Sequence, residues 1–206
     1  MSRTVILVAG PSGSGKSRLS GHTGVPQLRL DDFYFDIDRP GMPCVHFGGG
    51  DTTQTMVDWD DVASWDLAAA VEALASLVET GRATTPVYDI STSRATGSRE
   101  VDLDDSGSVL AEGIFAPDLL APCRERGLSV LPIWLDRPRE LNFLRRLRRD
   151  LAEHRKPPAV LVRRGVALYR HEPSLRAEAL ALGFEPMSMA QAQGAVRAFG
   201  CLAATT

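Results

Sequence analysis

The most constraining feature of this sequence is a complete phosphate-binding loop directly after an apolar run. Residues 10–17 read Gly-Pro-Ser-Gly-Ser-Gly-Lys-Ser and match the pattern G-x-x-x-x-G-K-S. The residues before the loop, Thr-Val-Ile-Leu-Val-Ala, are β-branched and apolar, as is typical of a buried parallel strand. The motif requires a strand, a glycine-rich turn and a helix start in that order. The sequence therefore predicts a nucleoside triphosphate site after a strand over residues 4–9.

Backbone and side chains of this loop both suit a phosphate. Its glycines can take backbone angles that a Cβ forbids, so successive N–H groups can point inward around the anion. Lys16 is expected to reach the β- and γ-phosphates, and the Ser17 hydroxyl is expected to ligate Mg²⁺. The helix that follows adds the positive end of its dipole. The expected nucleotide-binding residues are Gly10, Ser12, Gly13, Ser14, Gly15, Lys16, Ser17 and Arg18.

Length, charge and cysteine content restrict the class of protein. We expect a single domain over residues 1–206, because a chain of this length can bury its own core. The net charge of −3 disfavours a protein that coats nucleic acid, and three cysteines without metal-ligand spacing disfavour a disulfide framework. The N-terminal apolar run is too short for a signal peptide or a membrane span. We therefore expect a cytoplasmic protein with no nucleic-acid or membrane partner, and a homo-oligomer stays open.

Apolar runs separated by glycines and prolines predict alternating strands and helices. The first helix is expected to break soon after Leu19, and residues 36–57 are expected to form a long, mobile connection. The later strands are expected at residues 26–30, 84–88, 99–103, 108–111 and 128–135, with 84–88 and 99–103 paired as an antiparallel ribbon. The later helices are expected at residues 60–80, 117–126 and 189–199, with a helical region from Pro138 that breaks at Pro157-Pro158, Pro173 and Gly183.

Apolar strands that alternate with helices predict an α/β fold, with a parallel sheet covered on both faces. In such a sheet the ligand lies beyond the carboxyl ends of the strands. This rule gathers the phosphate loop, Asp31 and Glu112 at one edge, since each follows a predicted strand. Asp31 then suits the acceptance of an alcohol proton during phosphoryl transfer, and Glu112 suits Mg²⁺. The alternatives are a turn or helix-cap aspartate and a helix-start carboxylate.

Arginines gather on the helix that is expected after Pro138. Arg145 and Arg149 are four residues apart and share one face, with Arg146 beside them. This face ends near the Pro157-Pro158 break, so it is suited to closing over triphosphate oxygens in the transition state. A solvated helix face is the alternative that the sequence leaves open.

These motifs resemble the uridine kinase branch of the P-loop kinases, which also contains phosphoribulokinase and a pantothenate kinase. Besides the phosphate loop, the likeness rests on Asp31-Asp32-Phe33-Tyr34, Asp58-Trp59-Asp60, Trp65-Asp66, Pro86-Val87-Tyr88-Asp89 with Arg94, Ala111-Glu112-Gly113-Ile114 and Arg145-Arg146-Leu147-Arg148-Arg149-Asp150. It covers about residues 4–156. The resemblance implies a P-loop NTPase three-layer sandwich with a central parallel sheet, helices on both faces and a small helical lid, here over about residues 145–165.

The resemblance also implies a role for each site residue. The implied catalytic residues are Asp31, as the base, with Lys16, Arg146 and Arg149. The implied acceptor-binding residues are Asp31, Tyr34, Trp59, Asp60, Tyr88 and Arg94, with Trp59 and Tyr88 on a nucleobase and Asp60 on the ribose hydroxyls. The implied magnesium ligands are Ser17 and Glu112. One departure is that residues 90–94 lack the histidine with which uridine kinases usually read a pyrimidine.

The sequence thus predicts an ATP-dependent phosphotransferase that transfers the γ-phosphate to a small-molecule hydroxyl, such as the 5′-OH of uridine or cytidine. The absence of a guanine-reading Asn/Thr-Lys-x-Asp segment favours ATP over GTP. One alternative is a kinase of another metabolite alcohol, such as a sugar phosphate or a pantothenate-like compound. Another is an ATP-binding regulatory module without catalysis.

Overall fold

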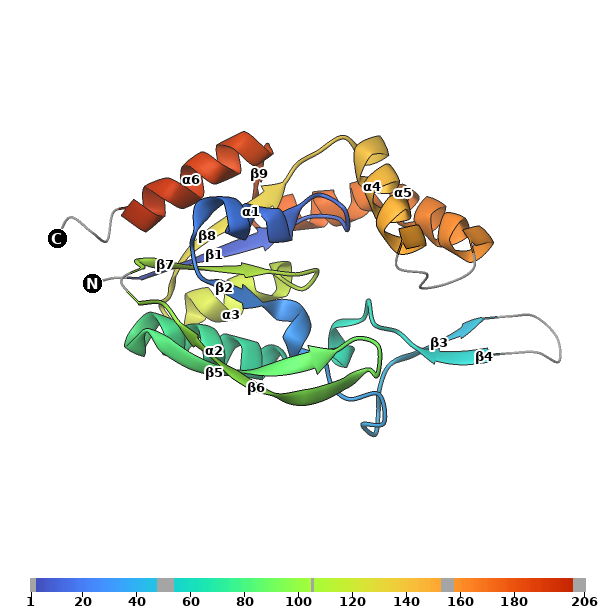
Figure 1. The fold of residues 1–206 in the computed structure, drawn as a ribbon, viewed down its shortest axis with the longest axis horizontal. Helices are drawn as coiled ribbons and strands as arrows, with labels where there is room; N and C mark the ends of the chain where they lie inside the picture. Colours follow the sequence, from blue (N-terminus) through green and yellow to red (C-terminus); the bar gives the residue numbers. More distant parts are fainter. Residues whose placement is uncertain (1–2, 48–53, 105, 153–157, 202–206) are drawn as a thin grey trace.

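The computed structural model describes residues 3–47, 54–104, 106–152 and 158–201. Its centre is a five-stranded sheet in the order β2-β7-β1-β8-β9, in which every neighbouring pair is parallel (Figure 1). The strands are β1 (Thr4–Ala9), β2 (Gln27–Arg29), β7 (Ser108–Glu112), β8 (Ser129–Leu135) and β9 (Glu185–Met187). The predicted parallel sheet is confirmed, and the predicted first strand is its central one.

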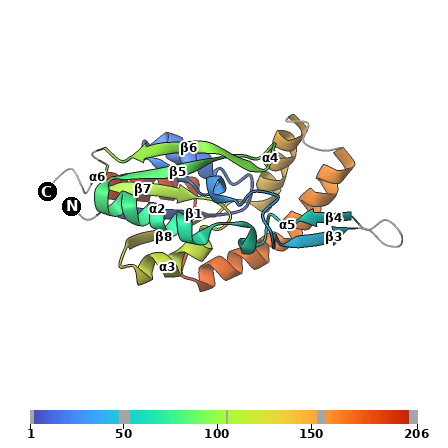
Figure 2. The same ribbon diagram turned by 90° about the horizontal axis from the view of Figure 1, so that it is seen from below.

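Helices cover both faces of this sheet, because the residues of β1 alternate between two apolar clusters. The covering helices include α1 (Lys16–Thr23), α2 (Leu67–Thr80), α3 (Leu120–Glu125) and α6 (Met189–Cys201). Val5 and Leu7 face the cluster built with α2 and α3, whereas Ile6 and Val8 face the cluster built with α1 and α6. All four side chains are fully buried. The predicted three-layer sandwich is therefore confirmed (Figures 1 and 2).

Two antiparallel ribbons lie outside the parallel sheet. In one, β5 (Arg82–Asp89) pairs with β6 (Arg94–Asp102), and in the other, β3 (Cys44–Phe47) pairs with β4 (Gln54–Val57). The β5–β6 ribbon contacts α2 and the 3-10 helix η1 (Leu30–Phe33), as Figure 2 shows for α2. The predicted ribbon is confirmed, and its strands are longer than expected.

A helix pair lies beside the phosphate loop (Figure 1). In it, α4 (Arg139–Ala152) packs against α5 (Pro158–Ala181). The start of α4 rests on the loop itself, because a Cβ built at Gly13 would lie only 2.5 Å from the backbone oxygen of Asn142. Gly13 also has a φ of +91°, which favours glycine. This one residue therefore serves both the loop conformation and the seating of α4. None of the helices in the described ranges combines the length and apolar character that crossing a bilayer requires.

Two strand-forming regions were not predicted. Residues 36–57, expected as a long connection, contain the β3–β4 ribbon, although residues 48–53 lie outside the described chain. β9 also has no predicted counterpart, because its short Glu-Pro-Met sequence carries no apolar periodicity. It becomes a strand by pairing with β8, whose Trp134 lies opposite Pro186.

Two helix boundaries differ from the prediction because local contacts outweigh sequence signals. No break occurs at Pro173, because α5 continues through this residue. The neighbouring Glu172 is buried, and packing offsets the backbone hydrogen bond that a proline cannot donate. The helix expected over residues 60–80 begins only at Leu67, because the Asp66 carboxylate accepts a 2.9 Å hydrogen bond from the backbone N–H of Ala69 and caps the helix there.

We expect Gly13→Ala to lower the thermal stability of the unliganded protein. The added Cβ would meet the Asn142 carbonyl and would need a strained backbone angle, a combination that costs about 1–3 kcal/mol of unfolding free energy. The measurement is the melting temperature, followed by circular dichroism. Gly21→Ala is the matched control: Gly21 lies in α1 with open space around its Cβ position, so the melting temperature should stay or rise. A Gly13→Ala protein that melts at or above the wild-type temperature would contradict the seating of α4.

Candidate active site

A cavity of about 340 Å³ lies where the carboxyl ends of β1, β2 and β7 meet α4. Asp31, Glu112 and Arg146 line this cavity, together with Ile114. The expected nucleotide-binding residues that line it are Ser12, Gly13, Gly15, Lys16, Ser17 and Arg18. The structure therefore gathers the residues at the edge of the sheet where the parallel topology predicts a ligand. The remaining two expected residues do not line the cavity: Ser14 of the loop is fully buried, and Gly10 directly follows the end of β1.

The phosphate loop holds its lysine close to its own backbone. The Lys16 ammonium donates a 2.8 Å hydrogen bond to the carbonyl of Gly10 and a 3.4 Å hydrogen bond to that of Pro11. Gly10 and Gly15 have φ values of +148° and +95°, which allow the loop to fold tightly over the start of α1. The lysine charge and the helix N-terminus thus lie together at one side of the cavity, as anion binding requires.

Oxygen atoms suited to a magnesium ion converge on the other side of the loop. The Ser17 hydroxyl donates a 2.8 Å hydrogen bond to Glu112 Oε1, and the Gln27 amide donates a 2.9 Å hydrogen bond to the same oxygen. Mg²⁺ prefers oxygen ligands and usually keeps few protein ligands beside phosphates and waters. One hydroxyl and one carboxylate, from Ser17 and Glu112, fit that habit. Gln27 was not predicted, because only the pairing of β2 with β7 brings it to Glu112.

Asp31 enters the cavity from η1, the turn that directly follows β2. Its neighbour across the sheet edge is Gly113, where a Cβ would lie 2.7 Å from the Cβ of Leu30 and 3.4 Å from Asp31 Oδ1. Only a glycine lets the turn approach this closely. Burial raises the pKa of Asp31, and the negative charge of Glu112 raises it further, whereas Lys16 acts in the opposite direction.

The aromatic residues expected at an acceptor form one cluster around Tyr34. Its ring centroid lies 5.5 Å from that of Trp59 and 5.8 Å from that of Tyr88. The Tyr34 hydroxyl also donates a 3.1 Å hydrogen bond to the carbonyl of Trp59. Phe115, which was not predicted, joins at 5.9 Å and links the cluster to the buried Trp65. The structure therefore brings three of the expected acceptor residues together.

Only Asp31 among the six expected acceptor residues lines the cavity, and the three aromatic residues, Asp60 and Arg94 all lie outside its lining. Asp60 is exposed, and the Asp58 carboxylate accepts a 3.1 Å hydrogen bond from its backbone N–H. Arg94 donates a 2.8 Å hydrogen bond to Asp38 and lies 4.0 Å from Asp36. Because Arg94 is held by two carboxylates, it ties the end of the β5–β6 ribbon to the loop after Tyr34.

Of the two arginines expected to act in a lid, the structure describes the side chain of Arg146 and not that of Arg149. Arg146 is only 5% exposed, lines the cavity and donates a 3.3 Å hydrogen bond to the carbonyl of Gly165 on α5. One turn earlier on α4, Asn142 donates a 2.9 Å hydrogen bond to the buried Glu172, whose pKa burial raises. The side chain of Arg149 and residues 153–157 lie outside the described part of the chain. The lid over residues 145–165 therefore stays a prediction.

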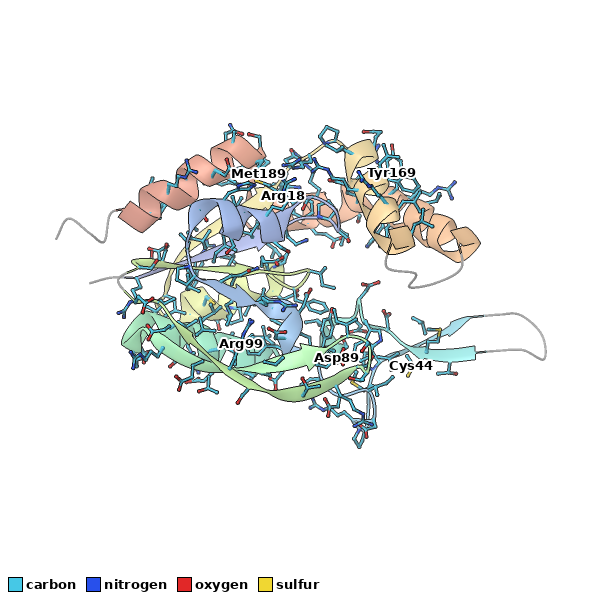
Figure 3. The ribbon with its side chains drawn as sticks, in the orientation of Figure 1. Arg18, Cys44, Asp89, Arg99, Tyr169 and Met189 are labelled. Atoms are coloured by element: carbon cyan, nitrogen blue, oxygen red, sulfur yellow. The ribbon has the colours of Figure 1, made fainter. Side chains whose placement is uncertain are left out.

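A cationic wall near the phosphate loop was not fully predicted. Burial lowers the pKa of Arg137, and the positive charges of Arg145 and Arg18 lower it further. Arg18, labelled in Figure 3 beside the loop, and Arg145 both line the cavity. Neighbouring positive charges favour an anion between them. The sequence signal for Arg137 is only its place two residues after β8, at the same edge of the sheet.

Several proteins that resemble this chain in sequence or fold are described as kinases. The model of the phosphoribulokinase/uridine kinase family matches residues 5–156. A uridine kinase from Lactobacillus johnsonii (strain CNCM I-12250 / La1 / NCC 533) is 26% identical over 149 residues, 72% of this chain and 68% of that protein. A solved structure described as a fructose transport system kinase, from Silicibacter sp. TM1040, has a TM-score of 0.53 at 21% identity and covers 88% of this chain and 84% of its own. Phosphoribulokinase from Rhodobacter spheroides has a TM-score of 0.50 at 17% identity, with 86% and 68% covered.

We expect Asp31→Asn to stabilise the nucleotide-free protein near neutral pH. Because the folded-state pKa of Asp31 is raised, the stability that this group contributes is present below the ordinary aspartate pKa and is lost as pH rises through the raised value. The asparagine amide does not ionise, so the variant avoids this loss. The melting temperature of Asp31→Asn should therefore exceed that of the wild type near neutral pH, and the difference should shrink as pH falls toward about 4. Thermal melts in the presence of a chelator measure this, with the exposed Asp60→Asn as control. A gain that grows on acidification would contradict the assignment.

Proposed function

The chain belongs to the phosphoribulokinase/uridine kinase family, and within it we propose an ATP- and Mg²⁺-dependent kinase that phosphorylates the 5′-hydroxyl of a nucleoside. One observation carries this proposal, the position of the turn η1. Its Asp31 shares a cavity with Lys16 and Glu112, and the next residue after the turn, Tyr34, is the centre of the aromatic cluster. A single short turn thus separates a site suited to a triphosphate from a surface suited to a base.

The donor half of the reaction uses the phosphate loop and α4. Backbone N–H groups of the loop and the Lys16 ammonium bind the triphosphate oxygens, and Arg146 neutralises charge that spreads over the γ-phosphoryl group in the transition state. Ser17 and Glu112 would hold Mg²⁺, which supplies further charge neutralisation when bound. Bulk water competes with the acceptor as nucleophile, and its exclusion is the role that the predicted lid would have.

The acceptor half places an alcohol beside Asp31. The alcohol oxygen forms the new bond to the γ-phosphorus as the bond from that phosphorus to the β,γ-bridging oxygen breaks, so that ADP leaves. Asp31 accepts the hydroxyl proton on its carboxylate. Its raised pKa increases its affinity for that proton and so favours the transfer.

The charges near the aromatic cluster favour an uncharged acceptor. Arg94 is paired with Asp38 at 2.8 Å, and Arg99 of β6 is paired with Asp32 at 2.9 Å. A phosphorylated sugar would need a cation that no carboxylate already neutralises. Tyr34 and Trp59 pack edge to face and are both half-buried, so they leave aromatic surface to which a flat base could bind. A nucleoside therefore fits the described surface better than a sugar phosphate.

A second candidate is a kinase of another metabolite alcohol, such as a sugar phosphate or a pantothenate-like compound. It is favoured by residues 90–93, the turn between β5 and β6, which read Ile-Ser-Thr-Ser without a histidine to read a pyrimidine. A third candidate is an ATP-binding regulatory module without catalysis. The shared cavity of Lys16, Asp31 and Glu112 argues against it, because binding alone does not need the aspartate.

We expect acceptor-dependent ADP release with uridine or cytidine, and little with pentose phosphates or pantothenate. The physical reason is the aromatic, charge-neutral surface beside Asp31. A coupled assay for ADP over a panel of these compounds, with mass detection of the phosphorylated product, measures it. Turnover with a sugar phosphate alone would establish the second candidate, and ATP binding without turnover for any compound would establish the third.

We expect Asp31→Asn to lower kcat by about 10²–10⁴-fold while leaving the Kd for ATP nearly unchanged, because the amide cannot accept the proton. Lys16→Ala should instead weaken both ATP binding and turnover, since the lysine contacts the phosphates in every state of the reaction. Isothermal titration and steady-state kinetics separate the two outcomes. An Asp31→Asn enzyme with nearly full kcat would remove Asp31 as the base.

A further inference from the structure

Asp32, the residue after the proposed base, is a buried carboxylate that is not part of the cavity lining. Its side chain is only 2% exposed, although it sits in the same 3-10 turn whose Asp31 lines the cavity. A buried carboxylate is costly unless other groups compensate its charge. Its compensation comes mainly from Arg99, whose Nη2 lies 2.9 Å from Asp32 Oδ2, while Arg29 Nε lies 4.0 Å from the same oxygen.

Arg99 is committed to this one carboxylate. It projects from β6, 67 residues away in sequence, and its hydrogen bond to Asp32 is its only side-chain bond within the described chain. Its Nε is buried without a hydrogen-bond partner there. The Arg99 side chain thus joins β6 to the turn η1 through one short ion pair.

The second oxygen of Asp32 reaches the acceptor side. Asp32 Oδ1 accepts a long hydrogen bond of 3.5 Å from the backbone N–H of Tyr88. The β5–β6 register shifts between Val87 and Tyr88, and such a bulge re-aims a side chain and disrupts the ladder locally. The Tyr88 ring in turn packs against Tyr34 at 5.8 Å between centroids. One carboxylate therefore contacts β6, the bulge of β5 and the turn that carries Asp31.

We propose that the Asp32–Arg99 pair is a positioning device, which sets the separation between the base Asp31 and the aromatic surface that holds the acceptor. The inference rests on the proposed function. The start of the same turn is held by Trp65, whose indole N–H donates a 2.7 Å hydrogen bond to the carbonyl of Leu30. With Leu30 held from one side and Asp32 from the other, the rotation of the turn is fixed, and Asp31 faces the cavity.

A second ion pair in the same ribbon provides a matched control. Arg82 lies 2.7 Å from Asp102, also between β5 and β6, but the two side chains are 75% and 37% exposed. An exposed pair of this kind contributes little to stability, and this one contacts neither η1 nor the aromatic cluster. Loss of Arg82 and loss of Arg99 therefore remove the same charge from the same ribbon, and only the second touches the turn.

The test compares Arg99→Met, Arg99→Lys, Asp32→Asn and the control Arg82→Met. We expect Arg99→Met and Asp32→Asn to weaken nucleoside binding and to lower kcat by about 10–100-fold, the scale of a misplaced reacting group. The Kd for ATP should change less than about twofold, because the phosphate loop is untouched. Arg99→Lys should recover part of the loss, and Arg82→Met should behave as wild type. Nucleoside binding measured by calorimetry does not depend on turnover.

A double variant separates positioning from simple destabilisation. Arg99→Met leaves a buried negative charge, which can destabilise the fold, whereas Asp32→Asn/Arg99→Met removes both charges. We expect the double variant to regain melting temperature without regaining kcat. Recovery of kcat together with stability would overturn the proposal, as would equal activity of Arg99→Met and Arg82→Met in an enzyme that does phosphorylate nucleosides. A wild-type protein that neither binds nor phosphorylates a nucleoside would instead remove the proposed function, and the inference with it.

Discussion

The site depends on two places where the main chain approaches another segment more closely than any side chain would allow. At Gly13 the phosphate loop meets the Asn142 carbonyl of α4, and at Gly113 the end of β7 meets Leu30 of the turn η1. The first contact brings Arg146 to the cavity, and the second brings Asp31. A Cβ at Gly13 would push α4 away from the phosphate loop. A Cβ at Gly113 would push the turn that carries Asp31 away from the end of β7. Packing of the backbone, more than any single polar bond, therefore sets the dimensions of the cavity.

Charge is distributed differently around the cavity and around the aromatic cluster. At the cavity, Arg18 and Arg145 are part of the lining and their positive charges lower the pKa of Arg137, so this region attracts anions. Near the aromatic cluster, where we propose that the acceptor binds, Arg94 and Arg99 are each paired with an aspartate. Asp31 lies between the two regions, where burial raises its pKa. A highly charged donor and a neutral acceptor are the ligands that such a distribution favours.

Much of the fold could be predicted because its signals are local. The apolar run of β1 and the glycines of the loop are contiguous, so the sequence predicts β1 with its observed bounds. The alternation of strands and helices predicts the parallel sheet. The places where the structure differs from the sequence-based prediction have a shared cause. β9 forms only because β8 offers an edge, and Pro173 stays helical only because α5 is held by its packing. Neither fact is encoded within a window of neighbouring residues.

The sequence by itself determined the chemistry of the edge: a phosphate loop, an aspartate after the second strand and a glutamate after a later strand, because these residue types follow strands whose ends must meet in a parallel sheet. The tertiary structure alone decided which partners those residues have. Gln27 on Glu112, Arg99 on Asp32 and Arg94 on Asp38 join segments 56 to 85 residues apart. Such contacts depend on strand register and on the direction of each side chain, which are fixed only when the whole core packs.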